Sequence, residues 1–166
     1  MRGRSRSSSV VVAVASCILM ISAVACGGST SSAHSLVSIP VVGDDGESST
    51  IGDFLGDRPL LISLWAVWCQ PCRRELPELA EIAADPQSGV DVLALNIGDD
   101  WSRIDEFMTE VGVEVPVAVD VDGAALEVLD AASVPVTVML GVDGEVIWEH
   151  TGAVTRDEIN AVLAGL

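Results

Sequence analysis

Lysine is absent from this sequence of 166 residues, and the eight arginines are outnumbered by 25 aspartates and glutamates, giving a formal net charge of −17. Nucleic acids and anionic lipid surfaces are polyanions, and proteins that bind them supply an excess of positive charge. The composition therefore argues against a nucleic acid as a partner and against binding to an anionic membrane surface through charge.

Metal-binding residues are also scarce, because the chain has four cysteines and two histidines. A tetrahedral zinc site needs about four ligands. Besides Cys69 and Cys72, the candidates beyond the first segment of the chain are Cys26, His34 and His150, and none stands at ligand spacing. We therefore expect no metal site.

The N-terminus has the layout of an export signal. Three arginines within the first six residues precede an apolar run over residues 10–25, which is short for a membrane-spanning helix. Ala23 to Ala25, followed by Cys26, resemble the lipobox of bacterial lipoproteins, although leucine is commoner than alanine at the position of Ala23. The resemblance implies cleavage before Cys26 and a lipid on its thiol. The alternatives are an uncleaved anchor, or a cut nearby that leaves Cys26 free.

Each alternative places the domain outside the cytoplasm, anchored to the outer face of the membrane or secreted. We expect three parts: a signal peptide over 1–25, a flexible Ser/Gly-rich tether over 26–38, and one folded domain over 39–166.

The pattern of apolar residues predicts alternating strands and helices. The expected elements are an edge strand within 36–42, a strand over 58–65, a helix over 71–84, a strand over 90–98, a helix over 99–111, a strand over 115–120, a short helix over 124–129, a strand hairpin around Asp143 and Gly144, and a capped helix over 155–166. Pro77 predicts a kink or break in the first long helix. This order indicates an α/β fold with helices on both faces of one mixed sheet.

Cys69 and Cys72 stand where a buried strand is expected to meet a helix. Unpaired backbone N–H groups in a first helical turn favour negative charge, so the position predicts a lowered pKa for Cys69. Its thiolate can attack a disulfide, and Cys72 can then resolve the mixed disulfide. An exported protein meets oxidising conditions, in which this pair can form a disulfide.

Other uses of the two cysteines fit less well. Haem attachment needs histidine directly after the second cysteine, and Arg73 is there instead. A structural disulfide is possible, but the loop it closes is too short to gain much stability. The sequence therefore favours a redox-active pair.

The segment "WCQPCRRELPEL" over 68–79 and the segment "ASVPVTVMLGVDGEVIWEHTG" over 132–152 resemble the TlpA/ResA/DsbE branch of extracytoplasmic thioredoxin-fold proteins. The resemblance runs from Leu36 to the end of the chain. It implies a thioredoxin-like fold with an inserted strand and helix, which we place within residues 90–111.

The same resemblance implies roles for individual residues. Cys69 would be the exposed nucleophile, Cys72 the buried resolving thiol, and the two would form the disulfide. Pro135 would be a cis-proline beside the pair, and with Val134 it would present backbone groups that hold a substrate strand. Trp68 would pack beside Cys69, although it is also a candidate core aromatic.

Glu75 takes the place of a family glutamate three residues after the second cysteine. It would share a helix face with Cys72 and act as a buried proton acceptor, or it would be a solvated helix carboxylate. Ser63 stands where cytoplasmic thioredoxins have a buried aspartate, which disfavours a general thioredoxin-like reductase. Ala66 stands where a peroxiredoxin would have threonine.

These observations predict a membrane-anchored, extracytoplasmic thiol–disulfide oxidoreductase that exchanges thiols and disulfides with exported proteins and needs no metal, nucleotide or flavin. The resemblance implies reduction of apocytochrome c before haem attachment, supplied by a membrane redox donor. One alternative is an oxidant that donates its disulfide to folding exported proteins and passes electrons to a membrane acceptor. Another is a non-catalytic lipoprotein that binds a partner and carries a structural disulfide.

Overall fold

A seven-stranded mixed sheet organises residues 36–166, the part of the chain that the computed structural model describes. In chain order the strands are β1 (Pro40–Val42), β2 (Ser48–Thr50), β3 (Leu60–Trp65), β4 (Asp91–Asn96), β5 (Val117–Val119), β6 (Val136–Leu140) and β7 (Val146–Thr151). The helices are the 3-10 helix η1 (Ile51–Phe54) and the α-helices α2 (Gln70–Ala84), α3 (Trp101–Val111), α4 (Ala124–Val128) and α5 (Arg156–Leu163).

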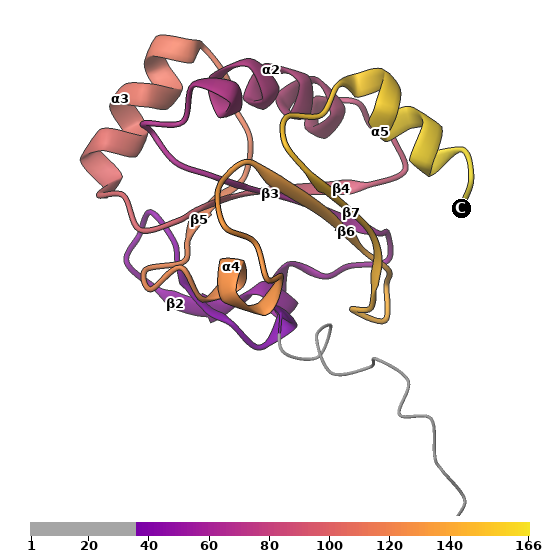
Figure 1. Ribbon diagram of the computed structural model, residues 1–166, viewed down its shortest axis with the longest axis horizontal. Coiled ribbons are helices and arrows are strands. Elements are labelled where there is room, and N and C mark those ends of the chain that lie inside the picture. Colours follow the sequence, from indigo (N-terminus) through magenta and orange to yellow (C-terminus); the bar gives the residue numbers. More distant parts are fainter. Residues whose placement is uncertain (1–35) are drawn as a thin grey trace, which may run out of the picture.

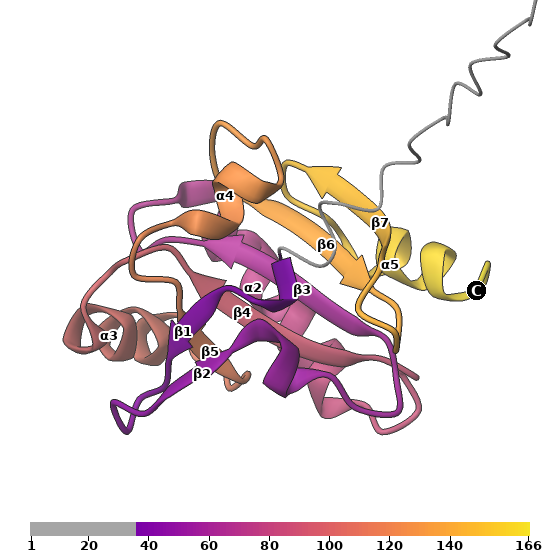
Figure 2. The ribbon, with the colours of Figure 1, turned by 90° about the horizontal axis from the view of Figure 1, so that it is seen from below.

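β3 is an interior strand of the sheet, and all six of its residues are buried. It pairs in parallel with β4 and antiparallel with β6, and the strand order is β2-β1-β5-β4-β3-β6-β7 (Figure 2). A strand enclosed on both faces requires apolar side chains on both faces, which explains the continuous apolar run of its sequence. The predicted mixed sheet is confirmed.

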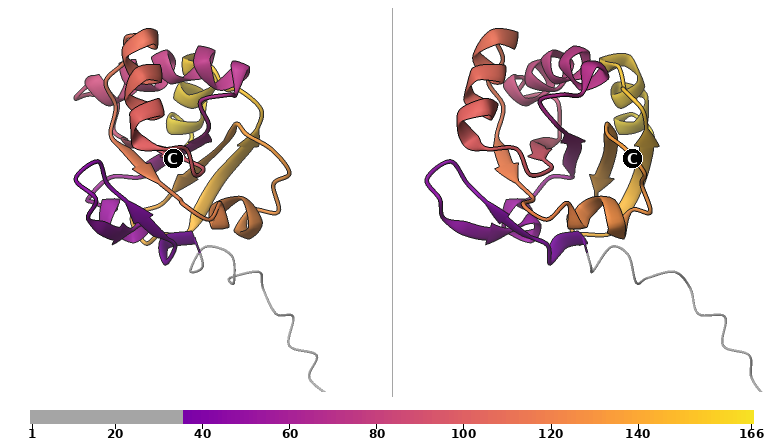
Figure 3. Two further views of the ribbon diagram at one scale, coloured as in Figure 1. Left: turned by 90° about the vertical axis from the view of Figure 1, so that its left-hand side faces the viewer. Right: turned by 60° about the vertical axis from the view of Figure 1, so that its left-hand side comes forward.

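Helices cover the two faces of the sheet unequally. α2, α3 and α5 lie on one face and α4 lies on the other (Figures 1 and 3). β3, β4 and β5 follow one another across the sheet, and right-handed crossovers therefore place α2 and α3 on the same side. The expected helices on both faces are thus present, and β4 with α3 occupies the segment in which we placed the family insertion.

The N-terminal part of the fold contains more structure than predicted. β2 and η1 lie within residues 48–54, where neither a strand nor a helix was expected. Leu36 is fully buried in the core, so the folded unit includes residues that the expected boundary at residue 39 left in the tether. The expected signal over 1–25, Cys26 and the tether up to residue 35 lie outside the described residues.

Pro77 was expected to kink or break this helix, and the break does not occur, because α2 runs as one helix from Gln70 to Ala84. Proline removes one backbone hydrogen bond from a helix. Leu76, Leu79 and Ile82 are buried on the face of α2 that packs on the core, and this packing compensates for the lost bond.

Two helix ends are set by local sequence, and the cap expected for the last helix is confirmed. Gly112 ends α3 with a left-handed φ of 73°, and Thr155 begins α5 in a capping box with Glu158. Within residues 36–166 no helix is both long and apolar enough to cross a membrane.

Candidate active site

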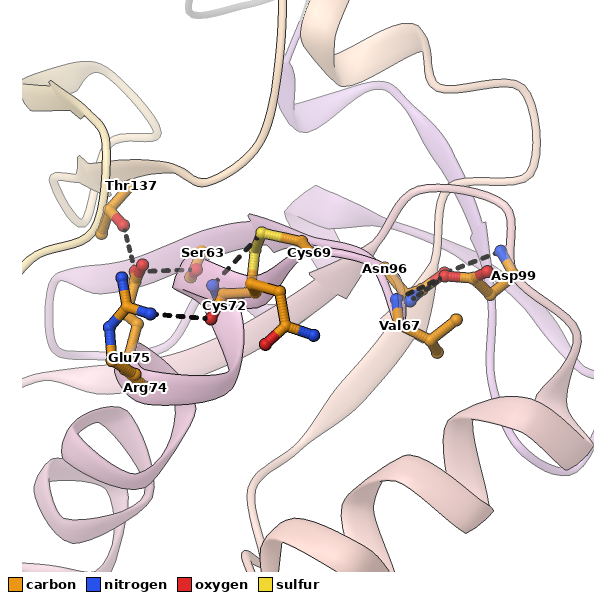
Figure 4. Close-up of a disulfide and its surroundings, with 10 residues drawn as sticks. Ser63, Val67, Cys69, Cys72, Arg74, Glu75, Asn96, Asp99 and Thr137 are labelled. Atoms are coloured by element: carbon orange, nitrogen blue, oxygen red, sulfur yellow. Dashed lines mark hydrogen bonds between the residues drawn. A yellow bond between two sulfur atoms is a disulfide. The ribbon is translucent and has the colours of Figure 1, made fainter.

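The two cysteines lie where β3 ends and α2 begins, and they form a disulfide with a Cα–Cα distance of 5.3 Å (Figure 4). Cys69 is the N-cap residue of α2, and its Sγ accepts a hydrogen bond of 3.2 Å from the Cys72 N–H. Pro71 occupies the first turn, where a missing N–H leaves no bond unmade. The first sulfur therefore lies at the electropositive end of the helix.

Both sulfur-bearing residues are buried in this disulfide form, since Cys69 is 3% and Cys72 1% exposed. The expectation that Cys69 is exposed is therefore wrong for the oxidised protein. The bond to Cys72 and the hydrogen bond from its N–H hold the Cys69 sulfur against the first turn of α2.

An exposed aromatic side chain stands beside the pair, that of Trp68, which precedes Cys69 and is 61% exposed. It is not a core aromatic. The buried indole of this segment is that of Trp65, which contacts Phe107 of α3 with ring centroids 5.0 Å apart.

Pro135 lies at the same edge of the sheet as the cysteines. β6 begins directly after it and runs antiparallel to β3, with Val136 opposite Leu64 near the end of β3. The peptide bond between Val134 and Pro135 is cis. Because β6 begins opposite the end of β3, the backbone before β6 lies at the same end of these two strands as Cys69 and Cys72.

Glu75 is buried one turn after Cys72, with 1% of its surface exposed, so it is not a solvated helix carboxylate. Its Oε1 accepts hydrogen bonds from the hydroxyls of Thr137, at 2.7 Å, and Ser63, at 3.0 Å (Figure 4). Burial raises the pKa of Glu75 to about 6, although the bonds from Thr137 and Ser63 and, more weakly, the backbone of Val154 oppose this effect.

The second carboxylate oxygen of Glu75, Oε2, has no hydrogen-bond partner among the described residues. A carboxylate with a pKa of about 6 exchanges its proton near neutral pH. Glu75 can thus take up or return a proton within the same helical turn as Cys72.

A second polar cluster flanks the disulfide on the side of β4. The Asp99 carboxylate accepts a hydrogen bond of 2.8 Å from the Val67 N–H and another of 3.1 Å from the Asn96 side chain. Sequence reasoning missed this cluster and also missed the two hydroxyls on Glu75. A signal existed for Ser63 and Thr137, because each is a polar residue inside an otherwise apolar strand.

The disulfide lies beneath the exposed residues Trp68 and Gln70, at the end of β3. A hollow of about 800 Å³ between α2 and α3 is lined by neither cysteine nor by Glu75. No three His, Cys, Asp or Glu side chains gather into a potential metal site in the part of the chain that the structure describes. The geometry suits an extended partner chain better than an enclosed small molecule.

Comparison with known proteins finds a family model and relatives that are thiol–disulfide oxidoreductases. The Redoxin family model matches residues 30–163. The thiol-disulfide oxidoreductase ResA of Bacillus subtilis (strain 168) is 30% identical over 117 residues, which cover 70% of this chain and 65% of that protein. The chain thus spans slightly less than two thirds of the length of this relative.

Two solved structures share the fold. The pneumococcal exposed lipoprotein thioredoxin Etrx1 of Streptococcus pneumoniae strain TIGR4 is 26% identical, with a TM-score of 0.62, over 76% of this chain and 98% of that one. A putative thiol:disulfide interchange protein DsbE from Chlorobium tepidum is 24% identical, with a TM-score of 0.64, over 75% and 91% of the two chains. The thioredoxin-like fold expected from the sequence is confirmed.

Proposed function

This chain belongs to the Redoxin family, among the thiol–disulfide oxidoreductases of the ResA and DsbE type, and on that premise we propose that it reduces disulfides in other exported proteins. The observation that carries the proposal is the placement of the redox pair. Cys69 caps α2 with its sulfur toward the Cys72 N–H, and the buried Glu75 follows one turn later.

The reaction begins from the reduced pair. The Cys69 thiolate, favoured by the N-terminus of α2, attacks one sulfur of a substrate disulfide. A bond forms between the Cys69 sulfur and that sulfur, and the other substrate sulfur leaves as a thiolate. Cys72 then attacks the Cys69 sulfur, which closes the Cys69–Cys72 disulfide and releases the second substrate thiolate. Two electrons have passed from the protein to the substrate.

Glu75 serves the second step as proton acceptor. Cys72 must lose its proton before it attacks, and Glu75 is the titratable side chain buried on the same helix face. The Oε2 atom supports this role, because neither Thr137 nor Ser63 donates to it, and it can receive a proton while Oε1 keeps both of those bonds. The proton then leaves Glu75 and neutralises a released substrate thiolate, by way of solvent.

Pro135, Val134 and Trp68 are proposed to contact the substrate chain. Pro135 directly precedes β6, and its carbonyl already accepts a hydrogen bond from the Gly152 N–H, so the backbone of Val134 is the group offered to an extended partner segment. Trp68 offers an exposed indole next to Cys69, and aromatic side chains contribute much of the energy in protein interfaces.

The proposal extends to the location and the biological task. Residues 1–25 act as the export signal, Cys26 carries the lipid, and the Ser/Gly-rich segment that follows tethers the domain to the outer face of the membrane. A membrane donor regenerates the reduced pair. Apocytochrome c, whose cysteines must be reduced before haem attachment, is the proposed substrate. The resemblance of the CxxC and Val-Pro-x-Thr segments to the TlpA/ResA/DsbE branch supports this task.

The first test is reduction of insulin by the full chain, with Cys69→Ser as the matched variant. We expect the wild type to reduce insulin and Cys69→Ser to show only the background rate. Equal rates would overturn the enzymatic role and favour a binding lipoprotein with a fixed disulfide.

The direction of electron flow is tested by the reduction potential of the Cys69–Cys72 pair. A reductase is expected near or below the value of thioredoxin, about −270 mV, whereas a strong oxidant lies near about −120 mV. A potential close to the latter would replace the reductase with a disulfide donor. Intact-mass analysis of membrane-extracted protein tests the anchor, since a lipid mass should be present in the wild type and absent from Cys26→Ser.

A further inference from the structure

The turn that connects β3 to Cys69 is hydrogen-bonded to a second loop, the one that follows β4. Within the turn, the Cys69 N–H donates to the Ala66 carbonyl at 3.0 Å. The Val67 N–H instead donates across to Asp99 Oδ2 at 2.8 Å, in the loop that follows β4. Trp68 lies between the fixed Val67 amide and Cys69. The position of both residues thus depends on a bond to Asp99.

Asp99 is itself fixed by hydrogen bonds with Asn96 and by an ion pair with Arg103. We call these contacts, together with the hydrogen bond from Val67, the Asp99 clasp. The Asp99 N–H donates to Asn96 Oδ1 at 2.8 Å, and Asn96 Nδ2 donates back to Asp99 Oδ2. Arg103 pairs with Asp99 Oδ1 at 3.1 Å, and only 6% of the aspartate side chain is exposed. Asn96 is fully buried at the end of β4, opposite Trp65. The clasp is therefore a rigid group rather than a surface contact.

A glycine turn is required to bring Asp99 back toward Val67. Gly98 has a φ of +83°, which side chains other than glycine rarely adopt, and a Cβ there would lie 3.0 Å from the Val121 carbonyl oxygen. Figure 4 shows the result, with Asp99 and Asn96 grouped around Val67 on the side of the disulfide away from Glu75.

Charge alone does not explain a carboxylate at this place. A negative charge near Cys69 disfavours a second negative charge on its sulfur. Any contribution of Asp99 to the reaction must therefore come from the position in which it holds the turn over 66–69. When the disulfide is reduced, Cys69 loses its covalent tie to Cys72. The turn over 66–69 must then keep the free sulfur aligned with the first turn of α2. Small misplacements of a reacting atom can cost as much as about 100-fold in rate.

We infer that Asp99 is a positioning residue of the exchange reaction: through the Val67 amide it holds the turn over 66–69, so that the reduced Cys69 sulfur stays aligned with the N-terminus of α2. This inference rests on the proposed function. It extends that function to a residue that touches neither cysteine nor the substrate.

Two substitutions separate position from charge. Asp99→Asn removes the charge and the pair with Arg103, but it keeps an oxygen that can accept the Val67 bond. Asp99→Glu keeps the charge, but its extra methylene moves the oxygens away from their positions. Asp100→Asn is the matched control, because Asp100 is exposed and its side chain makes no capping bond to α3.

The readouts use the reduced full chain. They are the rate of insulin reduction and the pH midpoint of alkylation at Cys69, followed by mass spectrometry of the peptide that carries it. We expect Asp99→Glu to be on the order of tenfold slower, the factor that a hydrogen bond to a charged group can supply, with its midpoint at higher pH. Asp99→Asn should stay within about threefold of wild type, because the partner that it loses, Arg103, is more than half exposed, and ion pairs with exposed groups contribute little.

Three results would overturn the inference. If Asp99→Glu matches Asp100→Asn in both readouts, Asp99 serves only the stability of the fold. If Asp99→Asn is impaired and Asp99→Glu is not, the residue acts by charge. If Asp99→Glu does not fold, Asp99→Ser takes its place, since serine is too short to reach Val67, and an unchanged midpoint in that variant is equally decisive. A wild type that fails to reduce insulin would refute the proposed function, whereas the alkylation midpoints would still test the clasp.

Discussion

Two carboxylates flank the disulfide, and the two regions around them are built in opposite ways (Figure 4). On the side of α2 and β6, Glu75 is fully enclosed, and one of its oxygens has no partner among the described residues. On the side of β4, Asp99 receives hydrogen bonds or an ion pair on both oxygens, from Val67, Asn96 and Arg103.

The difference shows how a fold assigns different tasks to one chemical group. Burial without full hydrogen bonding disfavours the charged form, so the pKa of Glu75 rises to about 6 and its proton becomes exchangeable. A carboxylate whose oxygens are all engaged instead fixes the groups that donate to it. The first region is suited to proton transfer and the second to holding the backbone.

The largest expected effect comes from Glu75→Gln, which preserves the shape of the side chain and removes the proton acceptor. We expect resolution of the mixed disulfide to slow on the order of 100-fold, the lower range for loss of a general base. In the wild type the rate should rise with pH through about 6, because Glu75 must be ionised, and this rise should vanish in the variant. Quenched-flow trapping of the mixed disulfide measures both quantities.

Asp99→Asn is the matched comparison for this experiment. It is also an acid-to-amide change, yet it keeps the hydrogen-bond acceptor that its region requires. Equal slowing in Glu75→Gln and Asp99→Asn would show that the two carboxylates do not have separate tasks, and the contrast between the two regions would fail.

A second, smaller effect concerns stability. The folded pKa of Glu75, about 6, lies above the unfolded value of 4.5, so protonation favours the folded state. This contribution is fully present below pH 4.5 and is lost as pH rises through 6. The difference of about 1.5 units corresponds to about 2 kcal/mol. The free energy of unfolding of Glu75→Gln minus that of the wild type should therefore increase by about 2 kcal/mol from pH 4.5 to pH 7, measured by urea denaturation of the oxidised proteins.

Asp100→Asn provides the reference for that measurement, because it is also an acid-to-amide change, made at an exposed side chain. If the difference for Glu75→Gln changes with pH no more than that of the reference, burial does not raise the pKa of Glu75.

The local sequence was sufficient to predict much of the fold and the two cysteines at the centre of the site. The apolar run of β3, the cysteine spacing at its end, the left-handed Gly112 and the capping box of Thr155 each act within a few residues, and each could be predicted. β2 and η1 escaped prediction because Ser48–Phe54 has no apolar alternation, and β2 is held by pairing with β1.

The environment of the reacting residues depends on contacts between distant parts of the chain. Glu75 could be a solvated or a buried carboxylate by its spacing alone, and Thr137, 62 residues away, completes its site. Val67 and Asp99 are 32 residues apart, and nothing local links them. Trp65 and Trp68 are equally apolar, yet the end of β3 buries the first and exposes the second.

The smallest effect, and the sharpest test of the Glu75 region, comes from removing the hydroxyls one at a time. Thr137→Val keeps the volume of a buried residue and deletes the shorter bond to Glu75, at 2.7 Å. Since that bond lowers the pKa, its loss should move the pH midpoint of mixed-disulfide resolution upward, by up to about one unit. Ser63→Ala deletes the longer bond, at 3.0 Å, and should move the midpoint less. A downward shift in either variant would mean that the hydroxyls stabilise the protonated acid, and the pKa of Glu75 would then be raised by its partners as well as by burial.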